Sequence, residues 1–254
     1  MPIVASFGAM TVRGLGLFSS VTGPSYWIGR LLASSGVGSR GVAIDPSGNV
    51  YLCGASTVSA SSEIQLAKYS SSGTLAWQVN LGTAGGDDTG SSVAVDSSGN
   101  AYITGAAGGV FQIAKYTTAG TLSWQRSLSG ESGSGLDATV DSSGNVYVCG
   151  YSNSGATYYL QIAKYDTSGN LSWKQRLTPV ADGALNGVAV DSSGNVFVCG
   201  YSNTGTYEFQ IAKYSSAGSL SWQRTLGAVA VEDFGQGVAL DAAGDVYILG
   251  SSNA

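Results

Sequence analysis

The chain repeats one alternation of apolar and polar residues five times. In the run Val188–Gly200, two apolar, β-branched stretches flank the polar turn Asp191–Asn195, a pattern typical of a β-hairpin with a glycine-containing turn. The turn aspartate recurs at intervals of 45 to 51 residues, at Asp45, Asp96, Asp141, Asp191 and Asp241. A fixed period in this range predicts an array of similar supersecondary units.

Each repeat contains four short strand-like segments, which we name A to D in chain order. Segment A resembles Val188–Asp191 and segment B resembles Val196–Gly200, whereas segment C ends in Lys-Tyr and segment D carries a tryptophan. The lysines are Lys68, Lys115, Lys164 and Lys213, and the tryptophans are Trp27, Trp77, Trp124, Trp173 and Trp222. Because no segment shows the 3.6-residue period of a helix, four hairpin-linked strands per repeat predict the blade of a β-propeller.

The two ends of the chain each supply half of one repeat. Residues 237–252 provide segments A and B alone, whereas residues 14–31 align with a later C–D pair, Gly23–Trp27 falling on Gly120–Trp124. Each half would leave an open sheet edge, and joined they complete one blade. The sequence therefore predicts an all-β, five-bladed β-propeller with four antiparallel strands per blade, closed by N-terminal strands that complete the C-terminal blade. The alternative is an open array that needs a partner chain.

Composition narrows the possible partners. The chain has 254 residues with 38 Gly, 11% charged residues, a net charge of −5 and no His. An acidic chain releases no counterions from phosphates, so we expect no nucleic-acid partner, and the lack of His removes the commonest general base and metal ligand. No run approaches the ~18 apolar residues of a membrane span, and residues 1–10 lack the basic start of a secretory signal.

The three cysteines share one position of the repeat. Cys53, Cys149 and Cys199 occupy the place that holds Thr104 and Leu249 in the other copies. A position that accepts Cys, Thr or Leu is a packing position, so buried thiols are favoured over a disulfide or a metal site.

The repeated polar and aromatic residues also have a structural interpretation. Asp-x-x-Gly-Asn offers one carboxylate per turn, too few oxygens for calcium, which favours an Asx turn in which Gly has positive φ. We expect the tryptophan and tyrosine rows to pack between blades. The segment C lysine should lie over the tryptophan or pair with a turn aspartate.

The repeat unit, from Gly-Val-Ala-Val-Asp through Gln-Ile-Ala-Lys-Tyr to the Trp of segment D, resembles the SBBP-type β-propeller repeat of bacterial and phage sequences. The resemblance covers residues 41–252 and implies the fold, with five copies where that family usually has seven. Separately, Ser6–Phe18 looks like short N-terminal segments of marine phage tail and other virion proteins. That second resemblance implies that residues 1–13 form an attachment segment, with the propeller spanning 14–254.

Ligand binding is expected where the copies differ. In a propeller the A–B and C–D turns share one face, and here they are short and uniform, whereas the B–C and D–A loops vary. A rigid scaffold that carries varied aromatic, amide and carboxylate groups suits recognition of a sugar or host surface; the alternative is plain solvated loops. The candidate ligand-binding residues are Tyr151, Asn153, Tyr158, Tyr159, Tyr201, Asn203, Tyr207, Asp87, Asp88, Glu232 and Asp233.

Catalysis is not expected. Carboxylates that could lie near the central mouth are Asp87, Asp88, Asp137, Asp182 and Asp233. A glycosidase needs two specialised carboxylates about 5–9.5 Å apart, and the near-identical inner strands indicate no such pair. The chain also lacks a nucleophile elbow, a phosphate loop and a metal constellation, so we expect no catalytic residue, metal or cofactor.

Together these features predict a phage virion protein, tail- or capsid-associated, that displays its variable face to a host surface or glycan. Phe7, Met10 and Arg13 in the N-terminal segment are the expected attachment residues toward other virion proteins. Two alternatives remain: a structural protein that decorates the particle without a host ligand, and a bacterial extracellular or cell-surface lectin-like module.

Overall fold

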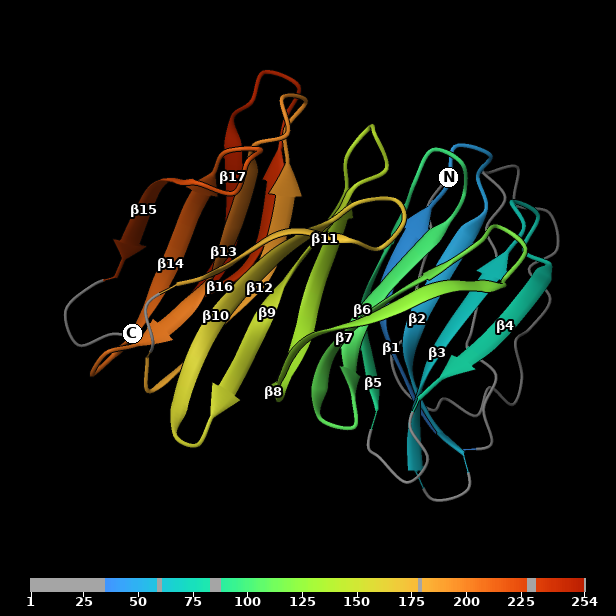
Figure 1. Cartoon of the computed structure of the whole chain (residues 1–254), viewed down its shortest axis with the longest axis horizontal. Helices are drawn as coiled ribbons and strands as arrows, with labels where there is room; N and C mark the ends of the chain where they lie inside the picture. Colours follow the sequence, from blue (N-terminus) through green and yellow to red (C-terminus); the bar gives the residue numbers. More distant parts are fainter. Residues whose placement is uncertain (1–34, 59–60, 83–87, 178–179, 228–231, 254) are drawn as a thin grey trace, which may run out of the picture.

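The computed structural model describes residues 35–253 except 59–60, 83–87, 178–179 and 228–231 (Figure 1). The described residues form 17 strands, and their ladders are antiparallel. Over this part of the chain, no helix is long and apolar enough to cross a membrane. The all-β, antiparallel fold expected from the sequence is confirmed.

Two sheets each contain one complete repeat, with segments A to D paired in chain order. The first consists of β1 (Ser35–Ile44), β2 (Val50–Val58), β3 (Ser61–Tyr69) and β4 (Leu75–Leu81). The other consists of β12 (Asp182–Val190), β13 (Val196–Asn203), β14 (Tyr207–Tyr214) and β15 (Leu220–Leu226). A two-stranded sheet, β16 (Glu232–Leu240) and β17 (Val246–Asn253), supplies segments A and B alone.

Two further repeats share one long strand in a seven-stranded sheet. Its members are β5 (Thr89–Val95), β6 (Ala101–Ala107), β7 (Val110–Tyr116), β8 (Leu122–Val140), β9 (Val146–Ser154), β10 (Thr157–Tyr165) and β11 (Leu171–Arg176). Ser132 of β8 pairs with Val110 on one side and with Asn153 on the other. The D–A connection between these two repeats, which the sequence predicted to be a loop, is instead extended strand, because both neighbouring strands offer partners for its backbone groups.

We refer to the repeats as blade 1 (β1–β4), blade 2 (β5 to the first half of β8), blade 3 (the second half of β8 to β11), blade 4 (β12–β15) and the terminal hairpin (β16–β17). The blades follow one another across the molecule, and β16 contacts blade 4 (Figure 1). The described sheets do not form a closed ring. The closing strands predicted at 14–31 lie outside the described residues.

The core lies between successive blades. Cys149 and Ile162 of blade 3 are buried together with Val188 and Val198 of blade 4. All three cysteines are free and buried, as predicted. Burial raises the pKa of the Cys199 thiol to about 12, so this thiol is an inert packing group rather than a nucleophile.

The two ends of the array expose residues that are buried elsewhere. Tyr247 and Leu249 of β17 are 58% and 66% exposed, whereas the equivalent Tyr147 and Cys149 of blade 3 are 0% exposed. On β1, at the other end, Val42 is 48% exposed. Each blade covers the face of its neighbour, and these end faces have no described blade against them.

Candidate functional site

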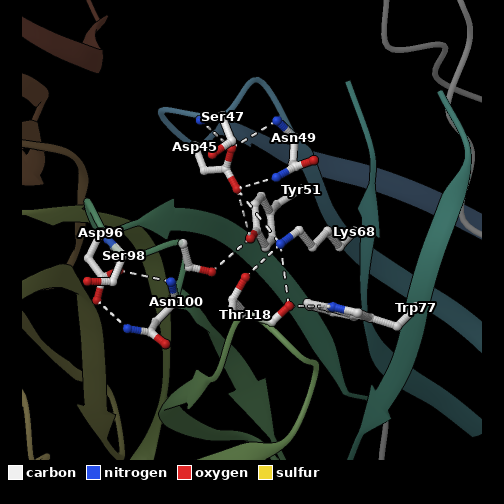
Figure 2. Close-up of polar contacts among 11 residues, drawn as sticks. Asp45, Ser47, Asn49, Tyr51, Lys68, Trp77, Asp96, Ser98, Asn100 and Thr118 are labelled. Carbon is white, nitrogen blue, oxygen red and sulfur yellow. Dashed lines mark hydrogen bonds and ion pairs between the residues drawn. The ribbon is translucent and has the colours of Figure 1, made fainter. Parts of the chain in front are cut away.

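The aspartate of each A–B turn is held by its own turn (Figure 2). Asp45 Oδ1 accepts the backbone N–H groups of Ser47 at 3.0 Å and Asn49 at 2.9 Å, and Oδ2 accepts the Asn49 side-chain amide at 2.8 Å. Gly48 has a φ of 79°, which a glycine adopts without strain. Burial favours the neutral acid, but these hydrogen bonds and the Lys68 charge lower the pKa of Asp45. The predicted Asx turn is confirmed.

The same turns join neighbouring blades, as Figure 2 shows for blades 1 and 2. The Tyr51 hydroxyl donates to the Gly99 carbonyl at 2.7 Å, and Lys68 Nζ donates to the Thr118 hydroxyl at 2.7 Å. The Trp77 indole donates to the Thr118 carbonyl at 3.0 Å. Equivalent indole bonds run from Trp124 to Thr167 and from Trp173 to Ser216. The face made of A–B and C–D turns is thus a repeated structural contact.

The segment C lysines lie over aromatic rings of segment B. Lys68 Nζ is 3.8 Å from the Asp45 carboxylate. The sequence predicted that this lysine would either pair with a turn aspartate or lie over the tryptophan, and the structure has the pairing. Its ring partner is Tyr51, 5.1 Å away, rather than the tryptophan. Lys115, Lys164 and Lys213 lie over Tyr102, Tyr147 and Phe197 in the same way. The lysine row therefore belongs to the structural contact.

On the opposite face, the B–C connections are tight hairpins rather than the loops that the sequence predicted. β9 continues to Ser154 and β10 begins at Thr157, because Gly155 adopts a φ of 62° and lets the ladder run to the turn. Most of the candidate residues consequently lie in strands and are half-buried: Tyr151, Asn153, Tyr158, Tyr159, Tyr201, Asn203 and Tyr207.

A cluster of three aromatic rings lies where blade 4 meets the terminal hairpin. The rings of Tyr201 and Tyr207 lie 5.1 Å and 5.0 Å from that of Phe234, and 5.7 Å from each other. The Tyr207 hydroxyl donates to Asp182 Oδ2 at 2.8 Å, and this bond raises the pKa of Tyr207. Burial, reinforced by the Asp182 charge, raises the pKa of Tyr201 to about 12. The phenols therefore stay neutral donors at physiological pH.

A second tyrosine pair lies one blade earlier. The rings of Tyr151 and Tyr158 are 5.6 Å apart. Burial raises the pKa of Tyr151, and the Asp182 carboxylate contributes. We call Tyr151, Tyr158, Tyr201, Tyr207, Phe234 and Asp182 the aromatic patch, because Val180, which pairs with Tyr158, lies two residues before Asp182, which accepts the Tyr207 hydroxyl.

Three predicted residues do not contribute to the patch in the expected way. Tyr159 points to the other side of β10, where the Arg176 guanidinium lies 4.7 Å from its ring, because successive strand residues alternate faces. Asp88 is 0% exposed and accepts the Gly108 N–H at 2.6 Å, so it stabilises a turn. Asn203 Oδ1 accepts the Gly205 N–H at 2.9 Å.

Of the other predicted positions, three lie within the described residues and four lie outside them. Glu232 is exposed and Asp233 half-buried at the start of β16. Asn153 lies opposite Tyr158 in the β9–β10 ladder. Asp87 and the attachment residues Phe7, Met10 and Arg13 lie outside the described residues.

Asp137 occupies an inner-strand position where the other repeats have Gly or Ser. Its carboxylate accepts the Ser92 hydroxyl of blade 2 at 2.8 Å and the Val188 N–H of blade 4 at 3.0 Å. Burial raises its pKa. Asp137 thus joins three blades. Across the described residues, no group of three or more His, Cys, Asp or Glu side chains is placed to hold a metal ion.

The repeat geometry can be compared with known families. The model of a beta-propeller repeat family, SBBP, matches residues 80–112, 139–155 and 185–208. Each matched segment contains an A–B turn and the B strand of blade 2, 3 or 4. The chain carries SBBP beta-propeller repeats. The resemblance drawn from the Asp-Gly-Asn turn and its flanking strands is confirmed. No curated protein has detectable sequence similarity to the chain.

Solved structures share the architecture of these SBBP repeats at low identity. A Lactobacillus plantarum protein has a TM-score of 0.57 at 13% identity, over 85% of this chain and 64% of that chain. A Xanthomonas campestris gluconolactonase has a TM-score of 0.50 at 15% identity, over 83% and 69%. A Bacteroides caccae protein of unknown function has 0.49 at 12%, over 77% and 70%. At these identities the likeness shows the fold alone, although the relatives in fold include an enzyme.

Two members of the patch were not among the predicted ligand-binding residues. Asp182 is the first residue of β12 and Phe234 is the third residue of β16, and the SBBP repeat pattern before the A–B turn is too variable to place them. The register Asp182↔Asn203 and the pairing of Phe234 with Ser251 set them beside the tyrosines. A β-bulge shifts the register between Leu185 and Gly187 and between Gly235 and Gly237, so extending the A–B ladder backwards from the recurring turn would have placed each of them one residue out of register.

Proposed function

We propose that this chain is a non-enzymatic binding propeller that recognises a glycan through the aromatic patch. The observation that carries the proposal is the grouping of half-buried rings around one carboxylate, Asp182, on the face opposite the uniform turns. Aromatic rings offer large, rigid surfaces for the C–H faces of a sugar. The Asp182 carboxylate and the neutral phenols supply acceptors and donors for its hydroxyls.

The hydrogen bonds of three candidate acids support binding rather than catalysis. Asp88 holds a turn, Asp137 joins three blades and Asp182 accepts a tyrosine hydroxyl. A hydrolytic pair would need one carboxylic acid to protonate a leaving group and a second to act as base or nucleophile. Each of these three acids already has a hydrogen-bond donor from the protein.

The proposed molecule is a closed, five-bladed ring in which residues 14–31 supply segments C and D beside β17. A groove of about 350 Å³ lies beside β17, lined by Phe209, Leu226, Gly227, Asp233 and residues 250–252. Tyr247 and Leu249 of β17 are exposed, whereas the equivalent residues of blade 3 are buried. Two more strands would pair with the open edge of β17 and cover the groove, and the closed ring would bring blade 1 against Tyr247 and Leu249.

The tryptophan row supports the same closure. Trp77, Trp124 and Trp173 each donate to a carbonyl in the C–D turn of the next blade. Among the described residues, the Trp222 indole N–H has no acceptor. The C–D turn of a fifth blade would supply this acceptor.

The location of the protein stays a prediction. Residues 1–13 are proposed to attach the propeller to other proteins of a phage particle, where the aromatic patch would face the host. This part of the proposal rests on the N-terminal sequence. Localisation of the protein in purified particles by immunogold labelling would test it independently of ligand binding.

Glycan binding is testable with the intact chain on a glycan array. Tyr158→Ala and Tyr207→Ala should each weaken binding of any recognised glycan about tenfold or more, because each removes a stacking ring. Both rings are half-buried, so some loss of stability is expected, and the folded fraction of each variant must be measured by circular dichroism.

Ser142→Ala and Ser192→Ala are the matched controls. Both serines are exposed in A–B turns on the opposite face, and these variants should bind as the parent does. Equal losses from both faces, or an intact chain that binds no glycan, would reject the proposal.

A further inference from the structure

A second cavity lies between blades 3 and 4, beside the aromatic patch. It measures about 220 Å³. Val180 lines it and is bonded to Tyr158 of the patch through reciprocal backbone bonds of 2.9 and 3.0 Å. One wall is apolar, formed by Leu160, Leu177 and Val180; the other is polar, formed by Ser202, Thr204, Glu208, Gln210, Gln223 and Thr225. We call this cavity the inter-blade groove.

The groove is hollow because blade 4 carries smaller side chains than blade 3 at two of its lining positions. In each blade a segment C glutamine, Gln161 or Gln210, is buried. The residue paired with Gln161 is Arg176, and the residue paired with Gln210 is Thr225. In blade 3, the Arg176 guanidinium lies over the ring of Tyr159.

In blade 4, the position of Tyr159 is taken by Glu208, two residues before the glutamine. Replacement of a stacked Tyr–Arg pair by Glu and Thr removes a large volume of side chain. The space that blade 3 fills with its own side chains is therefore left open in blade 4.

The polar wall is pre-organised. The Gln210 amide donates to the Ser202 hydroxyl at 2.8 Å and to the Thr225 hydroxyl at 3.1 Å, and its Oε1 accepts the Gln223 amide at 3.0 Å. Ser202 and Gln210 are only 4% and 5% exposed. A network held in this way presents its remaining donors and acceptors to the groove without further ordering.

Glu208 is the charged group of this wall. Its side chain is half-buried and makes no hydrogen bond or ion pair with any other described residue. A half-buried carboxylate gains most from ligand groups that donate two hydrogen bonds, as two neighbouring hydroxyls do. The opposite apolar wall suits the C–H face of a ring.

We propose that the inter-blade groove binds a single sugar ring, with two neighbouring hydroxyls donating to Glu208 and the ring face against Leu160, Leu177 and Val180. The volume is below the roughly 300 Å³ at which ligand pockets for drug-sized molecules begin, so the occupant is one ring. The ligand class rests on the proposed function, and the site is separate from the patch rings.

The test uses saturation-transfer NMR on the intact chain with methyl glycosides of glucose, galactose, mannose and N-acetylglucosamine as probes. At least one probe should receive saturation, strongest at the ring protons that face the apolar wall. Glu208→Gln should weaken its binding about tenfold, because a charge-assisted bond becomes a neutral one.

The double variant E208Y/T225R is the sharper change, because it fills the groove with the pair that blade 3 already carries. It should abolish the saturation and leave the melting temperature of the parent unchanged. Asp245→Asn is the charge-matched control, because Asp245 is exposed in the A–B turn of the terminal hairpin, and it should bind each probe as the parent does.

The outcomes separate the two sites. Loss of array binding in the tyrosine variants with unchanged saturation in E208Y/T225R would overturn the groove and leave the patch. Loss of saturation in E208Y/T225R, with tyrosine variants that still bind, would support the groove and reject the patch. No saturation of any probe, or equal saturation in the parent and both Glu208 variants, would overturn the inference.

Discussion

At the scale of single residues, the environment decides what a carboxylate contributes in this repeat. Asp45 receives hydrogen bonds from its own turn, and its pKa is lowered; Asp137 is surrounded by three blades, and burial raises its pKa. The stability from Asp45 is present above the unfolded value near 3.8 and is lost as the pH falls through its folded pKa. The stability from Asp137 is present below 3.8 and is lost as the pH rises through its folded pKa.

Opposite pH slopes are therefore expected for two aspartate-to-asparagine variants. We would measure the free energy of unfolding in urea between about pH 3 and pH 7. Relative to the parent, D137N should gain stability as the pH rises, because it escapes the growing cost of a buried charge. D45N should lose stability relative to the parent over the same range. Slopes of the same sign in the two variants would contradict the assignment.

At the scale of the hairpin, the glycine of each C–D turn serves two purposes. Gly218 has a φ of 83°, and a Cβ there would lie 2.6 Å from the Trp173 ring. The same approach occurs at Gly120 and Gly169, toward the tryptophan of the preceding blade. The turn thus needs glycine both for its backbone and for the contact between blades.

Gly218→Ala should cost more stability than Gly155→Ala. Gly155 has a φ of 62°, and a Cβ added there would meet no described atom within 4 Å, so alanine at this position costs backbone strain alone, about 1–2 kcal/mol. At Gly218 the Trp173 ring must also move, which adds about 1–3 kcal/mol. Urea unfolding of both variants would measure the difference, and equal losses would show that the tryptophan contact is unimportant.

The sequence predicts the A–B turns well and the B–C connections poorly. The A–B turn has its own chemistry in Asp-x-x-Gly-Asn, which determines its conformation locally, and the structure agrees. The B–C connection between β9 and β10 carries no such recurring turn chemistry, so it was expected to be a loop, whereas the two strands pair up to Ser154 and Thr157 in a tight hairpin. For the same reason Tyr159 was placed with Tyr158, although alternate strand residues face opposite blades.

At the scale of the whole molecule, the repeat predicts the architecture, and its variations indicate the sites. The blades, their order and the packing role of the cysteine row follow from the period and from the residues that recur. The inter-blade groove follows from residues that change, since Glu208 and Thr225 stand where blade 3 has Tyr159 and Arg176. Comparing equivalent positions would have indicated that difference, but only the packing between two blades shows that it leaves a cavity.

Closure of the ring can be tested by truncation, because it depends on both ends of the chain. Deletion of residues 1–31 would remove the proposed C and D segments of the fifth blade and leave the exposed faces at Val42, Tyr247 and Leu249 without cover. A two-stranded hairpin is marginal by itself and an open edge favours association. We expect this truncated chain to aggregate in sedimentation experiments and to lose cooperative urea unfolding. Deletion of residues 1–13 alone is the control and should change neither property. If the chain without residues 1–31 unfolds like the intact protein and stays monomeric, the ring is closed in another way or is open.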